Sequence, residues 1–221
     1  MKENIQKTGD ASDTVYSTKY QAHYHSLHGA LEESIHVFIS AGLYHLYRKG
    51  YNKVSIFEMG CGTGLNGFLS LIEAKSLHLE IDYHSIESDP ISVDLVSELN
   101  YSVIFNDEQK YFEKLHLSEW DKLVPITPYF NLHKISGQLE SFASLQQYDI
   151  IYYDAFAPSA QPQLWEEKIH QKLYNSLLPG GVLVTYCSQG AFRRMLSSLG
   201  YQIEKLNGPA KKREMLRATK P

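Results

Sequence analysis

The sequence is poor in cysteine and lacks an apolar segment suited to a membrane span or a secretory signal. Its 221 residues include two cysteines, Cys61 and Cys187, which exclude a disulfide framework and a cysteine-rich zinc site and suit a reducing compartment. The first 25 residues contain no apolar stretch, so no secretory signal is expected. The uncharged run 173–192 contains a Pro-Gly-Gly at 179–181, which would break a membrane helix. We therefore expect a soluble cytoplasmic protein.

The chain also lacks an overall basic charge. Its formal net charge is −4 and its isoelectric point is about 6.2, which argues against a protein that binds nucleic acid through its whole surface. The charge is uneven, because residues 192–221 carry eight Lys or Arg and two Glu, so this end is net +6 and the remainder net −10. A basic C-terminal end on an otherwise acidic chain is typical of a surface that binds a polyanion. The alternative interpretation is a terminal hairpin whose basic side chains are only exposed to solvent.

The order of the predicted elements indicates an α/β fold. A strand at 54–59 is followed by a glycine turn, a helix at 65–77 and a second strand at 81–86, and this alternation predicts a parallel sheet with helices on both faces. Strands at 201–206 and 214–219 are joined by seven residues, too few for a helical crossover, so we expect them to be antiparallel. A mostly parallel sheet that ends in an antiparallel hairpin resembles the class I (Rossmann-like) methyltransferase fold.

The remaining elements are predicted from periodicity and turn residues. Residues 1–13 are polar and expected to fray, whereas 101–128 are less regular and are interpreted as an insertion or a helical segment. Pro90 is expected to open a helix that runs to about Leu99. Helices are also predicted at 31–47, 163–178 and 191–199, and strands at 130–135, 148–153 and 182–186.

The first motif with chemical meaning is the glycine turn Gly60-Cys61-Gly62-Thr63-Gly64 between the first strand and its helix. Glycines let the backbone approach a ligand closely, and a helix N-terminus offers free N–H groups. The turn also fits the Gly-x-Gly-x-x-Gly dinucleotide pattern, but its compact spacing and the preceding acid Glu58 favour S-adenosylmethionine. A tight structural turn is the alternative.

Two acids follow later strands of the predicted sheet. Glu87 ends the second strand, where nucleoside-binding α/β folds place an acid against ribose hydroxyls; Asp89 is a competitor for this role. Asp154 directly follows a buried strand and opens Asp154-Ala155-Phe156-Ala157-Pro158. A carboxylate there could accept an N–H bond from an amine and aim its lone pair at a methyl group. Either acid could instead be a strand-end or turn residue.

A metal site is not expected. His23, His25 and His28 are close in sequence, but no Cys or acid completes a recognised ligand spacing. Cys61 lies in the glycine turn and is interpreted as a packing residue.

Several stretches together resemble one family, the methyltransferase (MnmD) domain of the bacterial MnmC family. The resemblance covers about residues 16–219, and its motifs are 58–66, 154–158 with Pro162 and Trp165, 179–181, 188–194, 212–215 and the stretch around 24–38. It implies transfer of a methyl group from S-adenosylmethionine to the aminomethyl nitrogen of 5-aminomethyl-(2-thio)uridine at the tRNA wobble position. It also implies a helical or irregular extension at 1–50, packed on a methyltransferase domain at 51–221, without the oxidoreductase domain of the bifunctional enzymes.

The resemblance also implies roles for individual residues. Asp154 would be the catalytic residue and would aim the substrate amine. Cofactor contacts would come from Glu58, Gly60, Gly62, Gly64, Asn66, Glu87, Gln138 and Asp154. Substrate contacts would come from Phe156 and Pro158 beside the amine, and from Arg193, Arg194, Lys211, Lys212 and Arg213 against the phosphates of the anticodon stem-loop.

The expected partner is tRNA, and another enzyme is expected to supply the aminomethyl intermediate. Three alternatives remain at this stage. The chain could be a methyltransferase of a small amine or a protein, which would use the same site. It could be a degenerate fold that acts as a non-catalytic RNA-binding module. It could also be an aminopropyltransferase, which would use a related nucleoside.

Overall fold

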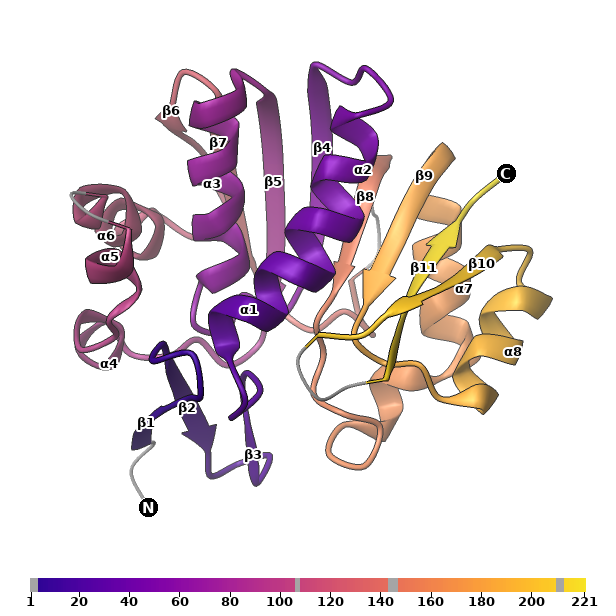
Figure 1. Cartoon of the computed structure of the whole chain (residues 1–221), viewed down its shortest axis with the longest axis horizontal. Coiled ribbons are helices and arrows are strands. Elements are labelled where there is room, and N and C mark those ends of the chain that lie inside the picture. The colour runs from indigo at the N-terminus through magenta and orange to yellow at the C-terminus, as the bar shows by residue number, and fades with distance from the viewer. Residues whose placement is uncertain (1–3, 106–107, 143–146, 210–212) are drawn as a thin grey trace.

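The computed structural model describes residues 4–105, 108–142, 147–209 and 213–221. Its main sheet has eight strands in the order β10-β11-β9-β8-β4-β5-β7-β6 (Figure 1). Five central strands are parallel, as predicted: β4 (Lys53–Met59), β5 (Glu80–Glu87), β7 (Phe130–Ser136), β8 (Tyr148–Tyr153) and β9 (Leu177–Thr185). Antiparallel strands complete both edges: β10 (Gln202–Asn207) with β11 (Glu214–Thr219), and β6 (Leu123–Thr127).

Helices cover both faces of this sheet. On one face, α1 (Ala30–Ser34) continues through a π-helical segment (Ile35–Leu43) into α2 (Tyr44–Tyr47), and α3 (Leu65–Leu77) packs beside it. On the other face lie α7 (Glu167–Ser176) and α8 (Gly190–Ser198), with α7 seen behind β9 and β11 in Figure 1. No helix within the described ranges is both long enough and apolar enough to span a bilayer.

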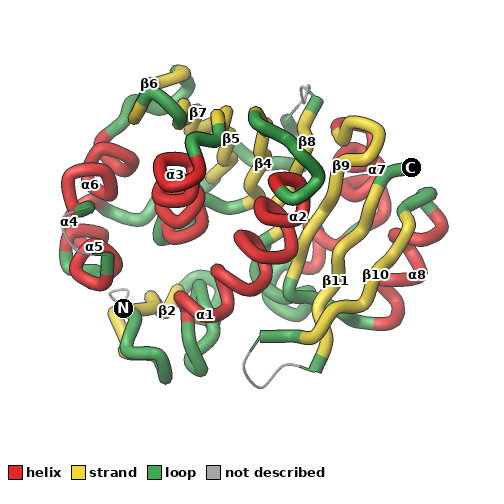
Figure 2. The backbone as a smooth tube through the Cα atoms, turned by 45° about the horizontal axis from the view of Figure 1, so that its top comes forward, coloured by secondary structure: helices red, strands yellow, loops and turns green. Residues whose placement is uncertain are grey.

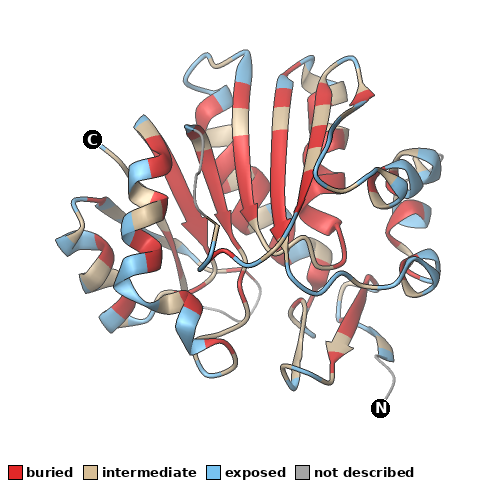
Figure 3. Ribbon diagram, turned by 180° about the vertical axis from the view of Figure 1, so that it is seen from behind, coloured by how far each residue is buried: buried red, intermediate tan, exposed pale blue. Residues whose placement is uncertain are grey.

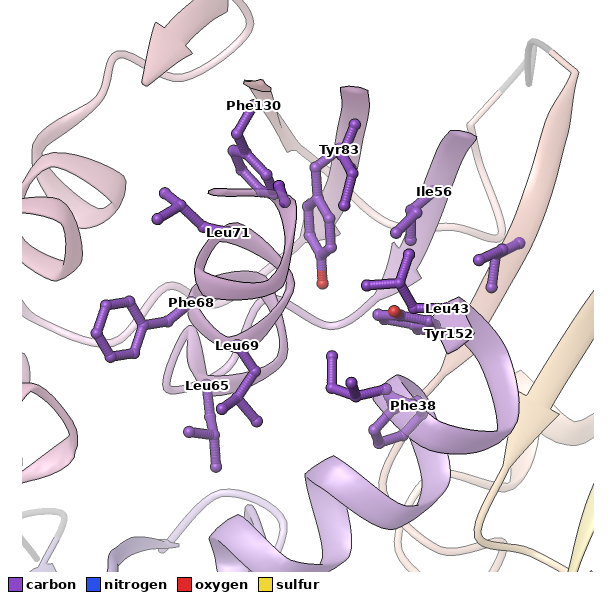
Figure 4. Packing of buried hydrophobic residues seen from close by; sticks show 14 of the residues in the cluster. Phe38, Leu43, Ile56, Leu65, Phe68, Leu69, Leu71, Tyr83, Phe130 and Tyr152 are labelled. Atoms are coloured by element: carbon purple, nitrogen blue, oxygen red, sulfur yellow. The ribbon is translucent and has the colours of Figure 1, made fainter. Parts of the chain in front are cut away.

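The core divides into two hydrophobic clusters, one on each face of the sheet. Ile150 and Tyr152 belong to one cluster, whereas Ile151 and Tyr153 belong to the other, because successive side chains of a strand point to opposite faces. The central strands are therefore buried along most of their length (Figure 3). Figure 4 shows the first cluster, in which Tyr83 and Tyr152 point between α3 and the π-helical segment.

A separate three-stranded sheet lies at the N-terminus. Strands β1 (Asn4–Lys7), β2 (Asp13–Ser17) and β3 (Ala22–His23) pair antiparallel, and Figures 1 and 2 show them beyond the carboxyl ends of the central strands. The expectation that residues 1–13 fray is thus wrong for the described part. Buried Asp13 anchors the sheet, because its carboxylate accepts a hydrogen bond from the Asn100 N–H (2.9 Å) and its carbonyl accepts one from the Tyr101 hydroxyl (2.7 Å).

Two predicted helix boundaries differ from the structure. Pro90 does not open a helix: α4 (Val93–Ser97) begins after Ser92, whose Oγ accepts a hydrogen bond from the Leu95 N–H. The helix predicted at 163–178 is a 3₁₀ turn (Pro162–Trp165) followed by α7. The Pro-Gly-Gly at 179–181 lies inside β9. The irregular stretch 101–128 contains α5 (Tyr101–Ile104), α6 (Gln109–Leu117) and the edge strand β6.

Candidate active site

A pocket of about 560 Å³ opens at the carboxyl ends of β4, β5 and β8. Ligands of open parallel sheets bind at this edge. The walls come from the glycine turn, from the residues that follow β5 and β8, and from the N-terminal segment. The lining residues are Tyr20, Tyr24, His25, Met59, Gly60, Cys61, Gly62, Thr63, Leu65, Asn66, Glu87, Ser88, Asp154, Ala155, Phe156 and Gln161.

The glycine turn has a backbone that only glycine adopts easily. Gly60, Gly62 and Gly64 have φ angles of 88°, 50° and 74°, in the left-handed region where a Cβ is strained. The Gly60 N–H donates to the Ile86 carbonyl (3.1 Å), which ties the turn to β5. A Cβ at Gly62 would lie 3.0 Å from the Tyr24 ring. The turn and this ring therefore enclose a narrow space that a larger residue would fill.

Glu87 holds the turn from the neighbouring strand. Its Oε2 accepts a hydrogen bond from the Gly62 N–H (3.2 Å), and its Oε1 accepts one from the Asp89 N–H (2.8 Å). Glu87 lines the pocket, whereas its competitor Asp89 does not line it and forms an ion pair with Lys19 (3.0 Å). Because a carboxylate offers about four acceptor positions, Glu87 can still receive hydroxyl donors from a ligand.

Asp154 lies opposite the turn, at the end of β8. Its Oδ2 accepts a hydrogen bond from the Asn66 amide (2.8 Å), which links it to the first turn of α3. The loop that follows is fixed at Phe156, whose N–H donates to Gln161 Oε1 (3.2 Å) and whose carbonyl accepts from Trp165 Nε1 (2.8 Å). The carboxylate is therefore held between two rigid elements.

A second pocket, of about 780 Å³, is also lined by Asp154. Its walls come from segment 22–28, from Glu33 and Tyr186, and from the loop after β8. Both pockets share five lining residues: Tyr24, His25, Asp154, Ala155 and Phe156. The site thus has two compartments, and Asp154 lines both of them.

Aromatic residues of the N-terminal segment contribute to this shared lining. Phe156 stacks on Tyr20 (ring centroids 4.6 Å apart) and meets Tyr24 edge-on (4.9 Å). His25 is buried, and its Nε2 lies 2.7 Å from the Thr63 hydroxyl in the glycine turn. Tyr20, Gln161 and Tyr186 belong to none of the predicted site motifs, whereas Tyr24, His25 and Glu33 lie in the stretch that resembles the family. Nothing in the local sequence reveals that this segment folds over the turn.

Glu58, in β4, and Gly64, the last residue of the turn, do not line either compartment. Glu58 is 1% exposed, and its carboxylate accepts a hydrogen bond from the Ser85 hydroxyl (2.9 Å). Burial raises the pKa of Glu58 to about 7. With Gly64, His116 and Lys134, it lines a smaller cavity of about 280 Å³ on the α3 side. Direct contact of Glu58 with a ligand in the main pocket therefore remains a prediction.

The other predicted residues are spread over the surface. Gln138 is exposed and Pro158 half-buried, and neither lines the two compartments. Arg193 and Arg194, in the first turn of α8, line a surface hollow together with Lys205, and Arg213 is exposed. Lys211 and Lys212 lie outside the described residues. The structure brings together Gly60, Gly62, Asn66, Glu87, Asp154 and Phe156.

In the part of the chain that the structure describes, no three His, Cys, Asp or Glu side chains come together as a metal site would require. His25 bonds to Thr63, and His23 lies 3.0 Å from the Gln6 amide oxygen. These histidines therefore have contacts within the N-terminal sheet and the glycine turn.

Sequence comparison links the chain to one class of enzyme. Residues 128–221 match the model of a family described as S-adenosyl-L-methionine-dependent methyltransferase. Over 219 residues the chain is 31% identical to the tRNA 5-methylaminomethyl-2-thiouridine biosynthesis bifunctional protein MnmC of Leptospira borgpetersenii serovar Hardjo-bovis (strain JB197), with 92% of this chain aligned. The chain is an S-adenosyl-L-methionine-dependent methyltransferase.

Other relatives agree with this assignment. The methyltransferase is 27% identical to the MnmC protein of Paraburkholderia xenovorans over 93% of its length. In both cases the match covers 33% of the relative, so the chain spans about a third of the curated relatives it matches. The crystal structure of MNMC2 from Aquifex aeolicus superposes with a TM-score of 0.83, at 20% identity, over 100% of this chain and 72% of that one. This likeness confirms the Rossmann-like fold.

The residues of the main pocket fit the cofactor of this family. S-adenosylmethionine combines a nucleoside with an amino acid. Glu87 lines the pocket and offers a carboxylate that can accept hydrogen bonds from ribose hydroxyls, and Gly62 leaves a space beneath Tyr24 that a Cβ would fill.

Proposed function

We propose that this methyltransferase acts on the aminomethyl nitrogen of 5-aminomethyl-(2-thio)uridine at the tRNA wobble position and forms 5-methylaminomethyl-(2-thio)uridine. The observation that supports this function best is the pair of compartments that share the Asp154 wall. One compartment fits the cofactor, and the other leaves room for an acceptor beside the same carboxylate. The names of the related MnmC proteins supply the acceptor class.

The bound cofactor supplies a methyl group on a sulfonium. The chain's own task is to present a neutral amine in line with that methyl group. Free alkylamines resemble lysine, with a pKa of about 10.4, and are mostly protonated at neutral pH. Asp154 accepts an N–H hydrogen bond, aims the lone pair and receives the released proton. Because the Asn66 amide holds Oδ2, the carboxylate is oriented before the amine arrives.

The aromatic wall suits an extruded base. Tyr24 and Phe156 border both compartments, and their rings can flank a planar base and exclude water from the reacting nitrogen. A wobble base belongs to a single-stranded loop, so turning it into a pocket costs little stacking energy.

Basic side chains lie at the same edge of the sheet and support a polyanionic acceptor. Leu216 of β11 pairs with Thr185, the last residue of β9, so Arg213 lies beyond the carboxyl end of β9. Lys205, Arg213 and Arg193 all lower the pKa of Glu214, so they surround one carboxylate. Arg193, Arg194 and Arg213 would bind phosphates of the anticodon stem-loop. Lys205 itself is paired with Glu214 (2.7 Å).

The substrate amine requires a preceding reaction. An activity that acts on the same tRNA beforehand, in the cytoplasm, would expose the aminomethyl group. Its product is the substrate of the reaction proposed above.

Methyl transfer to defined tRNAs tests this function. The purified protein is incubated with S-adenosylmethionine and either aminomethylated tRNA, unmodified tRNA or a free alkylamine, and nucleosides are analysed by mass spectrometry. We expect 5-methylaminomethyl-(2-thio)uridine from the first tRNA and no methylated nucleoside from the second. Absence of transfer to aminomethylated tRNA, with cofactor binding intact, would exclude the proposal. Transfer to the free amine alone would assign the chain to small-amine methylation.

A further inference from the structure

The acceptor compartment contains a second buried carboxylate. Glu33, in the first turn of α1, is 7% exposed and lines the compartment that Asp154 also borders. Its Oε2 accepts a hydrogen bond from the Ser26 N–H (3.0 Å), which fixes the side chain against segment 22–28. Neighbouring Glu32 is exposed. A buried acid that faces a ligand compartment needs donors to compensate its desolvation.

Both carboxylates lie around one tyrosine. The Tyr186 hydroxyl donates to the Ala155 carbonyl (2.8 Å). Burial raises the pKa of Tyr186, and the charges of Asp154 and Glu33 raise it further. Both acids therefore lie near this tyrosine, which lines the acceptor compartment together with them.

We propose that Glu33 and Asp154 each accept one N–H of the substrate amine, so that Glu33 selects a primary amine and limits transfer to one methyl group. This inference rests on the function proposed above. A neutral primary amine has two N–H groups and one lone pair. When two carboxylates hold the two N–H groups, the lone pair points in the third direction, towards the cofactor compartment.

The methylated product has too few N–H groups to donate a hydrogen bond to both carboxylates. The nitrogen lone pair forms the N–CH₃ bond while the C–S bond breaks, and the bonding pair stays on sulfur. The resulting secondary ammonium passes one proton to the Asp154 carboxylate and from there to water. The neutral product keeps one N–H for two carboxylates. A second transfer would place the first methyl group against one of the two carboxylates in place of an N–H, which costs a hydrogen bond to a charged group.

The test compares Glu33→Gln with the neighbouring surface variant Glu32→Gln. Each protein is assayed on aminomethylated and on methylaminomethylated tRNA, and S-adenosylmethionine affinity is measured by calorimetry. For Glu33→Gln we expect KM for aminomethylated tRNA to rise about ten- to a hundredfold, the size of one hydrogen bond to a charged group, and dimethylated nucleoside to appear. Cofactor affinity is expected to stay unchanged. Glu32→Gln is expected to behave as wild type.

The outcomes separate this inference from the proposed function. No transfer by the wild type to aminomethylated tRNA refutes the function itself. Dimethylation by the wild type, or single methylation with unchanged KM in Glu33→Gln, overturns the role of Glu33 alone. A parallel loss of cofactor affinity assigns Glu33 to structure and also overturns it. If Glu33→Gln does not fold, Glu33→Asp replaces it: its shorter reach is expected to raise KM for aminomethylated tRNA only, and an unchanged KM rejects the inference.

Discussion

Titration of buried Glu58 predicts that the methyltransferase loses stability as the pH rises through neutrality. The side chain is 1% exposed. Burial raises its pKa from 4.5 to about 7, although hydrogen bonds from Ser85 and Asn66 partly oppose the shift. The folded protein therefore keeps a proton on this carboxyl at pH values where the unfolded chain has released it.

The sign and size follow from linkage. Because the folded pKa lies above the unfolded one, the contribution of Glu58 to stability is complete below pH 4.5 and is lost as the pH rises through about 7. At about 1.4 kcal/mol per pH unit, the full loss is about 3 kcal/mol, of which about 2–3 kcal/mol falls between pH 5 and pH 8. Glu58→Gln mimics the protonated side chain at every pH and is expected to remove this loss.

Urea unfolding of wild type and Glu58→Gln from pH 5 to pH 9 measures the effect. The free energy of unfolding of the variant is expected to exceed that of the wild type by a margin that grows by about 2–3 kcal/mol up to pH 8. Buried His84, His116 and His170, whose pKa values burial lowers to about 4, 4 and 3, titrate in both proteins and cancel. Glu98→Gln removes an exposed charge as a control. A margin that is constant with pH would refute the reasoning.

Three further predictions concern the site. Gly62→Ala and Gly50→Ala both place a Cβ on a residue with positive φ, which costs about 1–2 kcal/mol of stability each. Only Gly62→Ala is expected to weaken cofactor binding in calorimetry, because Tyr24 lies 3.0 Å from the new Cβ, whereas nothing lies within 4 Å of a Cβ at position 50. Equal cofactor affinities of the two variants would contradict this role of the turn. Asp154→Asn is expected to lower kcat on aminomethylated tRNA about 10²–10⁴-fold with cofactor affinity retained, and an unchanged kcat would reject Asp154 as the catalytic residue. Arg193→Glu combined with Arg194→Glu is expected to weaken tRNA binding and to reduce the slope of log K against log salt by about 1–2, whereas an unchanged slope would place the phosphates elsewhere.

The central sheet could be predicted because its strands are buried on both faces. Segments such as 148–153 are apolar at nearly every position, as parallel strands between two helical layers must be. The antiparallel pairing of β10 and β11 could be predicted from the length of their connection, because seven residues are too few for a helical crossover between parallel strands. Strands β1 and β3 left no such pattern, because their side chains are exposed or half-buried. The sheet that they form with β2 is anchored by contacts between residues far apart in sequence, such as Asp13 of β2 with Asn100, 87 residues away.

The start of β9 shows how sheet pairing can overrule a local signal. The Pro-Gly-Gly predicts a helix that ends at residue 178, whereas α7 ends at Ser176. The same residues nevertheless continue as strand, because Leu177 pairs with Tyr148, and the register shifts before Val182 pairs with Ile150. A bulge of this kind accommodates the extra residues, and the sequence alone does not reveal it.

Among the predicted site residues, position along a strand separates those that face the pocket from Glu58. Glu87 is the last residue of β5 and Asp154 directly follows β8, so both stand at the edge where ligands bind. Glu58 is the penultimate residue of β4, and alternation gives it the same face as Ile56, towards α3. The two-residue alternation of side chains along a strand therefore predicts, from the sequence alone, that Glu58 points towards α3 and away from the main pocket.

The two compartments also differ in which part of the chain builds them. The cofactor side uses the glycine turn and strand ends of the Rossmann-like sheet, whereas the acceptor side is walled by segment 22–28 and Glu33. Asp154 lies within the 128–221 match to the methyltransferase family model, and the N-terminal wall lies outside it. Since a carboxylate at the end of β8 can serve any amine, the choice of acceptor must come from the residues opposite it. We therefore expect acceptor specificity to come from the N-terminal segment, which lines this compartment with Asp154 and carries Glu33.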